Sequence, residues 1–205
     1  NGVVGVHAEQ GNQCVKDAID AFPDFFWGLA TFDVIHEDAE TMRAQMEEIF
    51  ADKRFLGLKP YRLFADDPAD CRMRDFLPEH QIELADDMGL AITMHLAKKS
   101  GAADKENQED LARYTRQYPR AQWILAHCAR AFNAFMMEEA IQFLTGLPNI
   151  WYDTSAVNDL YTHFLLMKHE DRGRVMFGSD NIVAGCARGK YITYGRAWEF
   201  FPGHG

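Results

Sequence analysis

The stretch Arg174-Val-Met-Phe-Gly-Ser-Asp180 carries the signal that decides the fold, because it joins an apolar run to a carboxylate. Three consecutive apolar residues, Val175 to Phe177, predict a strand that is buried on both faces. Gly178 interrupts the run, and Asp180 stands at its carboxyl end, where parallel α/β barrels carry their chemistry. A simple turn or a helix N-cap explains Gly-Ser-Asp about equally well. The choice depends on whether the layout recurs in the chain.

The layout recurs upstream, with apolar runs of strand type alternating with helical patterns. Such alternation predicts an α/β fold with an all-parallel sheet. No GxGxxG or GxxxxGK[ST] sequence follows a predicted strand, so a doubly wound nucleotide-binding fold has no positive support. A TIM (β/α)8 barrel fits better, although only seven strands are found. The predicted strands cover residues 2–6, 25–32, 55–58, 90–94, 123–126, 150–152 and 175–177.

Composition narrows the classes of partner. The 205 residues carry a formal net charge of -10, so there is no basic excess to bind nucleic acid or an anionic membrane. The four cysteines are widely spaced and predict reduced thiols rather than disulfides or a zinc knuckle. No signal peptide or membrane-spanning run is apparent. We therefore expect a cytoplasmic protein with a small-molecule substrate, and a homo-oligomer is possible.

Polar residues stand at the carboxyl ends of the predicted strands, and in a closed barrel these ends converge on one face. Imidazole and carboxylate groups together suit a divalent metal such as zinc, which lowers the pKa of bound water. A nearby aspartate can accept a proton, and a neutral imidazole can orient the nucleophile or protonate a leaving group. Each residue alone has an ordinary structural explanation. The residues are His7 or Glu9, Asp33, Lys59, His95, His127, Asp153 and Asp180.

Several of these strand ends resemble those of a known family. Their sequences are Gly57-Leu-Lys-Pro-Tyr61, Thr93-Met-His-Leu96, Leu125-Ala-His-Cys128, Trp151-Tyr-Asp-Thr-Ser155 and Phe177-Gly-Ser-Asp180. In order and spacing they are similar to strands four to eight of the amidohydrolase superfamily. The nearest branch is the amidohydrolase-related group, which holds metal-dependent hydrolases and enzymes of the aminocarboxymuconate-semialdehyde decarboxylase type. The passage Ala21-Phe-Pro-Asp-Phe-Phe-Trp-Gly28 also resembles the lead into strand three of that group.

The resemblance implies roles for individual residues. His95 is expected to bind a divalent metal, with zinc the first expectation, and Asp180 to act as a ligand or as the base beside the metal. His127 is expected to be the catalytic histidine of a mononuclear site, or a second ligand in a binuclear one. Residues 1–205 are then expected to form a single metal-dependent hydrolase-like barrel domain.

The chain departs from this family at its beginning. Family members start with a strand that ends in His-x-His and supplies two metal ligands, and this sequence contains no His-x-His. The place of His7-Ala8-Glu9 before the Ala21–Gly28 passage makes it the end of strand two. The resemblance thus predicts an incomplete barrel in which strands two to eight are visible and the first strand and closing helix are not in the chain.

Three cationic side chains indicate that the substrate carries a negative charge. Lys59, Arg130 and Arg188 are candidates to pair with a substrate carboxylate, and guanidinium suits that planar contact. The leading expectation is a hydrolase in which metal-activated water attacks an ester, lactone or amide carbon of a small, carboxylate-bearing substrate. The alternative is metal-dependent, non-oxidative decarboxylation of a small unsaturated or aromatic acid. A third possibility is an inactive barrel that serves as a binding protein.

Overall fold

The computed structural model describes residues 7–181 and 191–200. Among these residues, six strands form one parallel sheet in the order of the chain, and two later strands form an antiparallel hairpin. Each strand of the large sheet pairs with the next one, as expected for successive βαβ units. The strands are β1 (Gly28–Ala30), β2 (Phe55–Leu58), β3 (Ala91–Met94), β4 (Gln122–Leu125), β5 (Ile150–Asp153), β6 (Val175–Met176), β7 (Tyr191–Tyr194) and β8 (Ala197–Phe200).

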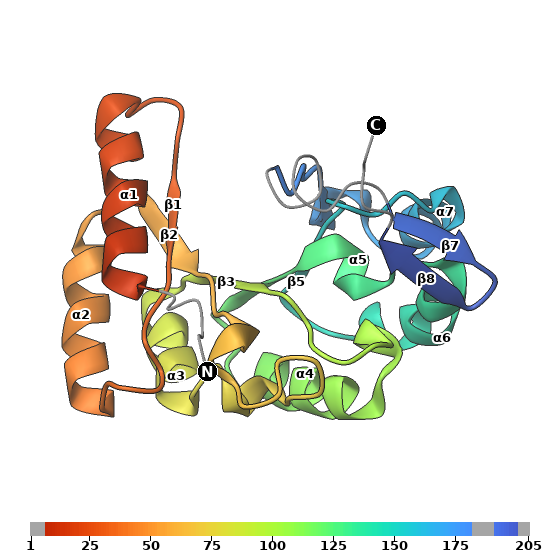
Figure 1. Ribbon diagram of the computed structural model, residues 1–205, viewed down its shortest axis with the longest axis horizontal. Helices are drawn as coiled ribbons and strands as arrows, with labels where there is room; N and C mark the ends of the chain where they lie inside the picture. The colour runs from red at the N-terminus through yellow and green to blue at the C-terminus, as the bar shows by residue number, and fades with distance from the viewer. Residues whose placement is uncertain (1–6, 182–190, 201–205) are drawn as a thin grey trace.

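The helices connect successive strands, and Figure 1 shows α2, α3 and α4 along one side of the strands, with α6 and α7 beyond β5. Aspartate and asparagine caps begin several of them, with a side-chain oxygen accepting from the first-turn amides. The arrangement is that of a (β/α)8 barrel, present in part. The helices are α1 (Ala8–Ala21), α2 (Ala39–Ala51), α3 (Glu79–Met88), α4 (Lys105–Gln117), α5 (Ala126–Arg130), α6 (Ala134–Leu144) and α7 (Leu160–His169).

The core lies between the strands and this helical layer. In β3, Ile92 and Met94 are fully buried, whereas Ala91 and Thr93 are half-buried. The strands therefore alternate in burial instead of being buried on both faces. A strand has this alternation when one face packs on helices and the other faces a partly open interior.

No helix in the described part of the chain is long and apolar enough to cross a membrane.

The stretch that indicated the fold is less buried than expected. The strand β6 contains only Val175 and Met176, both half-buried, and Phe177 is 91% exposed. The expectation of a strand buried on both faces was wrong here, because β6 forms the edge of the described sheet. The expected strand over residues 2–6 lies outside the described residues.

The pairing of β2 with β3 depends on a close approach at Gly57. A Cβ added to Gly57 would lie 2.0 Å from the carbonyl oxygen of Ala91, its partner in the pairing. Replacing Gly57 with alanine would force the two strands apart, and we expect the free energy of unfolding to fall by about 3 kcal/mol or more. Urea denaturation measures this loss.

Gly11 provides the matched control. It lies exposed within α1, and a Cβ there would meet no atom within 4 Å. Gly11→Ala is expected to raise the free energy of unfolding by about 0.5–1 kcal/mol, because alanine is the better helix former. A Gly57→Ala protein as stable as the wild type would contradict the close packing of β2 against β3.

Candidate functional site

A cavity of about 420 Å³ lies at the carboxyl ends of the parallel strands. The side chains that line it come from segments far apart in the sequence, as expected where barrel strands end together. Most of its wall is built from residues that directly follow β2, β3, β4 and β5. It is lined by Lys59, Pro60, Tyr61, Arg62, Leu63, Thr93, His95, Ala126, His127, Arg130, Phe132, Asp153, Ser155, Ala156, Gly178, Asp180 and Trp198.

Two imidazoles face each other in this cavity. The rings of His95 and His127 are 5.0 Å apart, centre to centre, in an edge-to-face arrangement. The Nδ1 atom of His95 lies 3.0 Å from the carbonyl oxygen of Leu96, and that of His127 lies 3.1 Å from the carbonyl oxygen of Ser155. The Nδ1 atom of His127 also lies 2.8 Å from the hydroxyl oxygen of Ser155, which can accept or donate. A carbonyl oxygen only accepts, so the two carbonyl contacts favour the tautomer in which Nδ1 carries the hydrogen. Each neutral imidazole therefore keeps the lone pair of Nε2 free for a metal ion or a proton.

Burial keeps both imidazoles neutral. It holds the pKa of His95 well below the usual value, and the neighbouring His127 lowers that pKa further. The pKa of His127 is also lowered by burial, while the carboxylates of Asp153 and Asp180 act in the opposite direction. The two carboxylates therefore partly offset the effect of burial on the pKa of His127.

His127 and Arg130 lie on an unusual left-handed turn after β4. All four residues from His127 to Arg130 have positive φ angles, between 50° and 59°, and none of them is glycine. This conformation costs roughly 1–2 kcal/mol per residue, and such strain concentrates at functional sites. Residues three apart in a helical turn project from the same side, which brings both side chains to the cavity.

Arg130 is a buried cation. Its side chain is 8% exposed, its Nη1 donates to the carbonyl oxygen of Lys98, and its guanidinium lies 5.7 Å from the centre of the Trp198 ring. Within residues 7–181 and 191–200, its Nε has no hydrogen-bond partner and no carboxylate lies at ion-pair distance. Burial, together with the charge of Arg62, lowers the pKa of Arg130 to about 10.

Lys59 and two carboxylates complete the polar wall. Burial lowers the pKa of the Lys59 amine, and the negative charges of Asp153 and Asp180 oppose this shift. Gly178 allows the close approach of Asp153, because a Cβ there would lie 2.2 Å from Oδ1 of that carboxylate. The Oδ1 atom also accepts from the backbone amide of Ser155, so Asp153 braces the end of β5 instead of capping α7.

The structure thus brings His95, His127, Asp180, Lys59 and Arg130 to one cavity. Arg188, the remaining candidate for the substrate carboxylate, lies outside the described residues. Among the wall residues that sequence reasoning missed are Arg62, Phe132 and Trp198. Trp198 comes from the β7–β8 hairpin, whose aromatic sequence was visible but whose place beside the cavity depends on the fold.

The donor types at this cavity suit a divalent metal ion. Both imidazoles present an unprotonated Nε2, fixed by a backbone carbonyl, which is the usual support for a metal-binding histidine. In the described part of the chain, however, no three histidine, cysteine or acidic side chains stand close enough together to hold a metal ion.

The chain is similar to several proteins of known structure. A 4-oxalomesaconate hydratase from Rhodopseudomonas palustris is 18% identical, with a TM-score of 0.64 over 89% of this chain and 59% of the hydratase. A TIM-barrel protein from Bordetella bronchiseptica is also 18% identical, with a TM-score of 0.60 over 83% of this chain and 59% of that protein. At such identities the likeness shows the fold, which is an incomplete TIM barrel.

A third structure was determined with a metal ion. It is a dihydroxybenzoic acid decarboxylase from Polaromonas sp. JS666 with bound manganese and the inhibitor 2-nitroresorcinol. It is 15% identical, with a TM-score of 0.60 over 85% of this chain and 64% of the decarboxylase. The chain therefore spans between 59% and 64% of the lengths of these three proteins.

The family comparison covers most of the chain. A search of curated proteins finds no match. The family model described as amidohydrolase matches residues 3–198, which include every residue named around the cavity. The chain belongs to the amidohydrolase family.

Proposed function

We propose that this chain carries the catalytic core of a metal-dependent decarboxylase for small aromatic or unsaturated acids. The observation that supports it most is the buried guanidinium of Arg130, which has no acidic partner within the described residues. A buried charge without a partner is costly, and an anionic ligand would offset that cost. A substrate carboxylate matches the planar donors of guanidinium.

The shape and polarity of the wall suit a flat acid. Phe132 and Trp198 pack against each other with ring centres 4.6 Å apart, and Phe132 also stacks on the ring of His127 at 5.7 Å. Tyr61 lines the same cavity. Aromatic walls favour planar ligands through stacking, while the cations Lys59 and Arg130 favour a negative charge.

Decarboxylation needs a bound carboxylate and a proton for the carbon that loses it. Arg130 and Lys59 hold the carboxylate, and the aromatic walls hold the ring. The bond between the ring carbon and the carboxyl carbon breaks, its electron pair takes up the proton, and carbon dioxide leaves. We assign the proton transfer to His127: its Nε2 first takes up a proton from solvent and then gives it to the carbon that loses the carboxylate. Burial lowers the pKa of His127, and the carboxylates of Asp153 and Asp180 oppose that shift and so favour the protonated form that the step requires.

We assign the metal to His95 and Asp180. A divalent ion there would withdraw electrons from oxygen atoms of the substrate and help to orient them. Manganese is the first ion to test, because the similar decarboxylase from Polaromonas was determined with manganese bound. Zinc, which the sequence suggested first, is the second.

Hydrolysis, the leading expectation from the sequence, is the second candidate. The free Nε2 of His127 and the carboxylate of Asp180 could equally receive a proton from water that attacks an ester, lactone or amide carbon. The buried guanidinium and the aromatic wall favour decarboxylation. An inactive binding protein is the remaining alternative.

A product assay separates these reactions. The purified protein, supplied with Mn²⁺ or Zn²⁺, is incubated with a panel of hydroxybenzoates and with matched esters and lactones. We expect carbon dioxide from at least one acid, loss of this activity with a chelator and recovery with added metal. Ester or lactone cleavage without carbon dioxide would overturn the decarboxylase proposal in favour of hydrolysis, and binding without turnover would favour the inactive barrel.

A further inference from the structure

The loop after β3 holds the left-handed turn that carries Arg130. This loop, residues 97–104, follows the metal-ligand candidate His95 and leads into α4. The loop contacts the turn at two points: Lys98 contacts the guanidinium of Arg130, and Gly101 contacts the backbone of the turn. The turn is strained and uses no glycine of its own, so its shape must be maintained by neighbouring structure.

Lys98 makes the contact with the guanidinium. Its backbone carbonyl accepts from Nη1 of Arg130, which fixes one side of the guanidinium plane. Lys98 itself has a positive φ of 63°, and this conformation sets the direction of the carbonyl. The carbonyl can serve Arg130 only if the Lys98 backbone is held in place.

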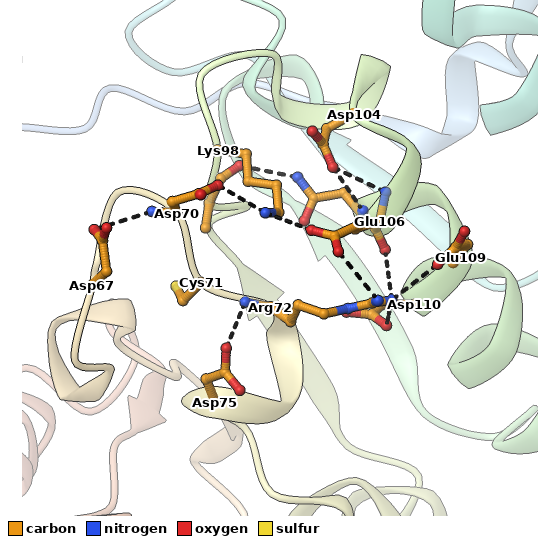
Figure 2. Close-up of polar contacts among 12 residues, drawn as sticks. Asp67, Asp70, Cys71, Arg72, Asp75, Lys98, Asp104, Glu106, Glu109 and Asp110 are labelled. Carbon is orange, nitrogen blue, oxygen red and sulfur yellow. Dashed lines mark hydrogen bonds and ion pairs between the residues drawn. The ribbon is translucent and has the colours of Figure 1, made fainter.

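The Lys98 side chain contributes to that hold, beside the backbone amide of Lys98, which donates to the carbonyl oxygen of Ala69 at 3.0 Å. Figure 2 shows the Lys98 amine between two carboxylates, and its Nζ lies 2.8 Å from Asp70 and 2.6 Å from Glu106. Beside this pair, Arg72 reaches Asp110 on α4 with an ion pair of 2.6 Å. The side chain of Lys98 is only about one-tenth exposed, whereas those of Asp70 and Glu106 are 72% and 46% exposed, so the two pairs tie a largely buried amine to the surface.

Gly101 makes the contact with the backbone of the turn. A Cβ added to it would lie 2.6 Å from the carbonyl oxygen of Arg130 and 3.0 Å from that of Ala129. Its φ is 53°, a conformation that other residues adopt at a cost. The buried side chain of Asn107 fixes the loop by donating to the carbonyl oxygens of Ala97 and Gly101, at 3.0 and 2.9 Å.

We propose that Lys98 and Gly101 are positioning residues for the guanidinium of Arg130. Lys98 orients the guanidinium through its carbonyl, and Gly101 sets the position of the backbone that carries it. The proposal deepens the proposed function and rests on it, because Arg130 is there the partner of the substrate carboxylate. It identifies the loop after β3 as a determinant of specificity for acids over uncharged analogues.

The test compares two matched pairs of variants. Gly101→Ala is paired with Gly89→Ala, which also replaces a glycine of positive φ but places its Cβ in open space. Lys98→Met is paired with Lys99→Met, which removes an exposed neighbouring lysine and no ion pair among the described residues. Lys98→Met also keeps the proposal testable if Gly101→Ala fails to fold.

Two measurements are made on each folded variant. The first is exchange with water of the Arg130 Nε–H in ¹⁵N NMR spectra, with the signal assigned by its loss in Arg130→Lys. The second is the binding of benzoate and of benzamide by calorimetry. We expect Gly101→Ala and Lys98→Met to lower the exchange protection at least about tenfold, because the local structure around the guanidinium opens more often. We also expect about tenfold weaker benzoate binding with unchanged benzamide binding.

The two measurements separate this inference from the proposed function. Unchanged Arg130 exchange in folded Gly101→Ala and Lys98→Met would overturn the positioning roles, as would an equal loss in the two control variants. If exchange changes as expected but the wild-type protein binds benzoate no better than benzamide, the positioning stands and the role of Arg130 in carboxylate binding is wrong.

Discussion

Replacing His127 with asparagine is expected to lower kcat for the decarboxylated acid by about 10²- to 10⁴-fold, the usual contribution of a proton-transfer group. Asparagine cannot carry the proton that His127 receives through its free Nε2. We expect KM and metal content to change little, since His95 and Asp180 hold the metal in this account. Steady-state kinetics together with metal analysis measure all three quantities.

A second histidine variant controls for loss of an imidazole as such. His36 lies on the surface with 76% of its side chain exposed, and its Nδ1 pairs only with Asp33 in the described residues. His36→Asn should leave kcat unchanged. A His127→Asn protein that keeps wild-type kcat would remove His127 from the proton-transfer step.

Replacing Arg130 with methionine should weaken function without weakening the fold. Loss of a charge-assisted contact worth about 1.5–3 kcal/mol should raise KM for the acid about 10- to 100-fold. The unfolding free energy should not fall, because the variant removes a buried cation that has no carboxylate partner among the described residues. The carbonyl of Lys98 loses the donor Arg130 but keeps the backbone amide of Gly101 at 3.2 Å, so this cost should not exceed the gain from removing the charge.

Kinetics and urea denaturation test both halves of this prediction. Arg120→Met is the control, because that side chain is 60% exposed and remote from the cavity lining. Arg120→Met should leave KM unchanged. If Arg130→Met has an unchanged KM and a lower stability, Arg130 is a structural residue and the carboxylate-binding role is wrong.

The positions of the cavity residues were largely predictable from local sequence. At Lys59, His95, His127 and Asp153 an apolar run changes to a polar residue, and the structure places all four at or just beyond a strand end. The local change from apolar to polar residues is enough to predict these positions, because parallel strands in a barrel must end on the same face. The order of the six strands followed from the same alternation.

The features that the sequence did not predict, the left-handed turn and the exposure of Phe177, depend on contacts between distant segments. Nothing in His127-Cys-Ala-Arg130 indicates a left-handed turn, since such turns normally require glycine. The turn packs instead against Gly101 in the loop after β3, where a Cβ would lie 2.6 Å from the carbonyl oxygen of Arg130. The exposure of Phe177 likewise depends on which elements cover the sheet edge, which a short apolar run cannot reveal.

The most direct test of the account is the metal content of the purified protein after incubation with Mn²⁺ and gel filtration. We expect a stoichiometric amount of bound manganese in the wild type and in His36→Ala, and a large loss in His95→Ala and in Asp180→Ala. No bound metal in the wild type, or the same amount in all four proteins, would contradict a metal-dependent site at this cavity.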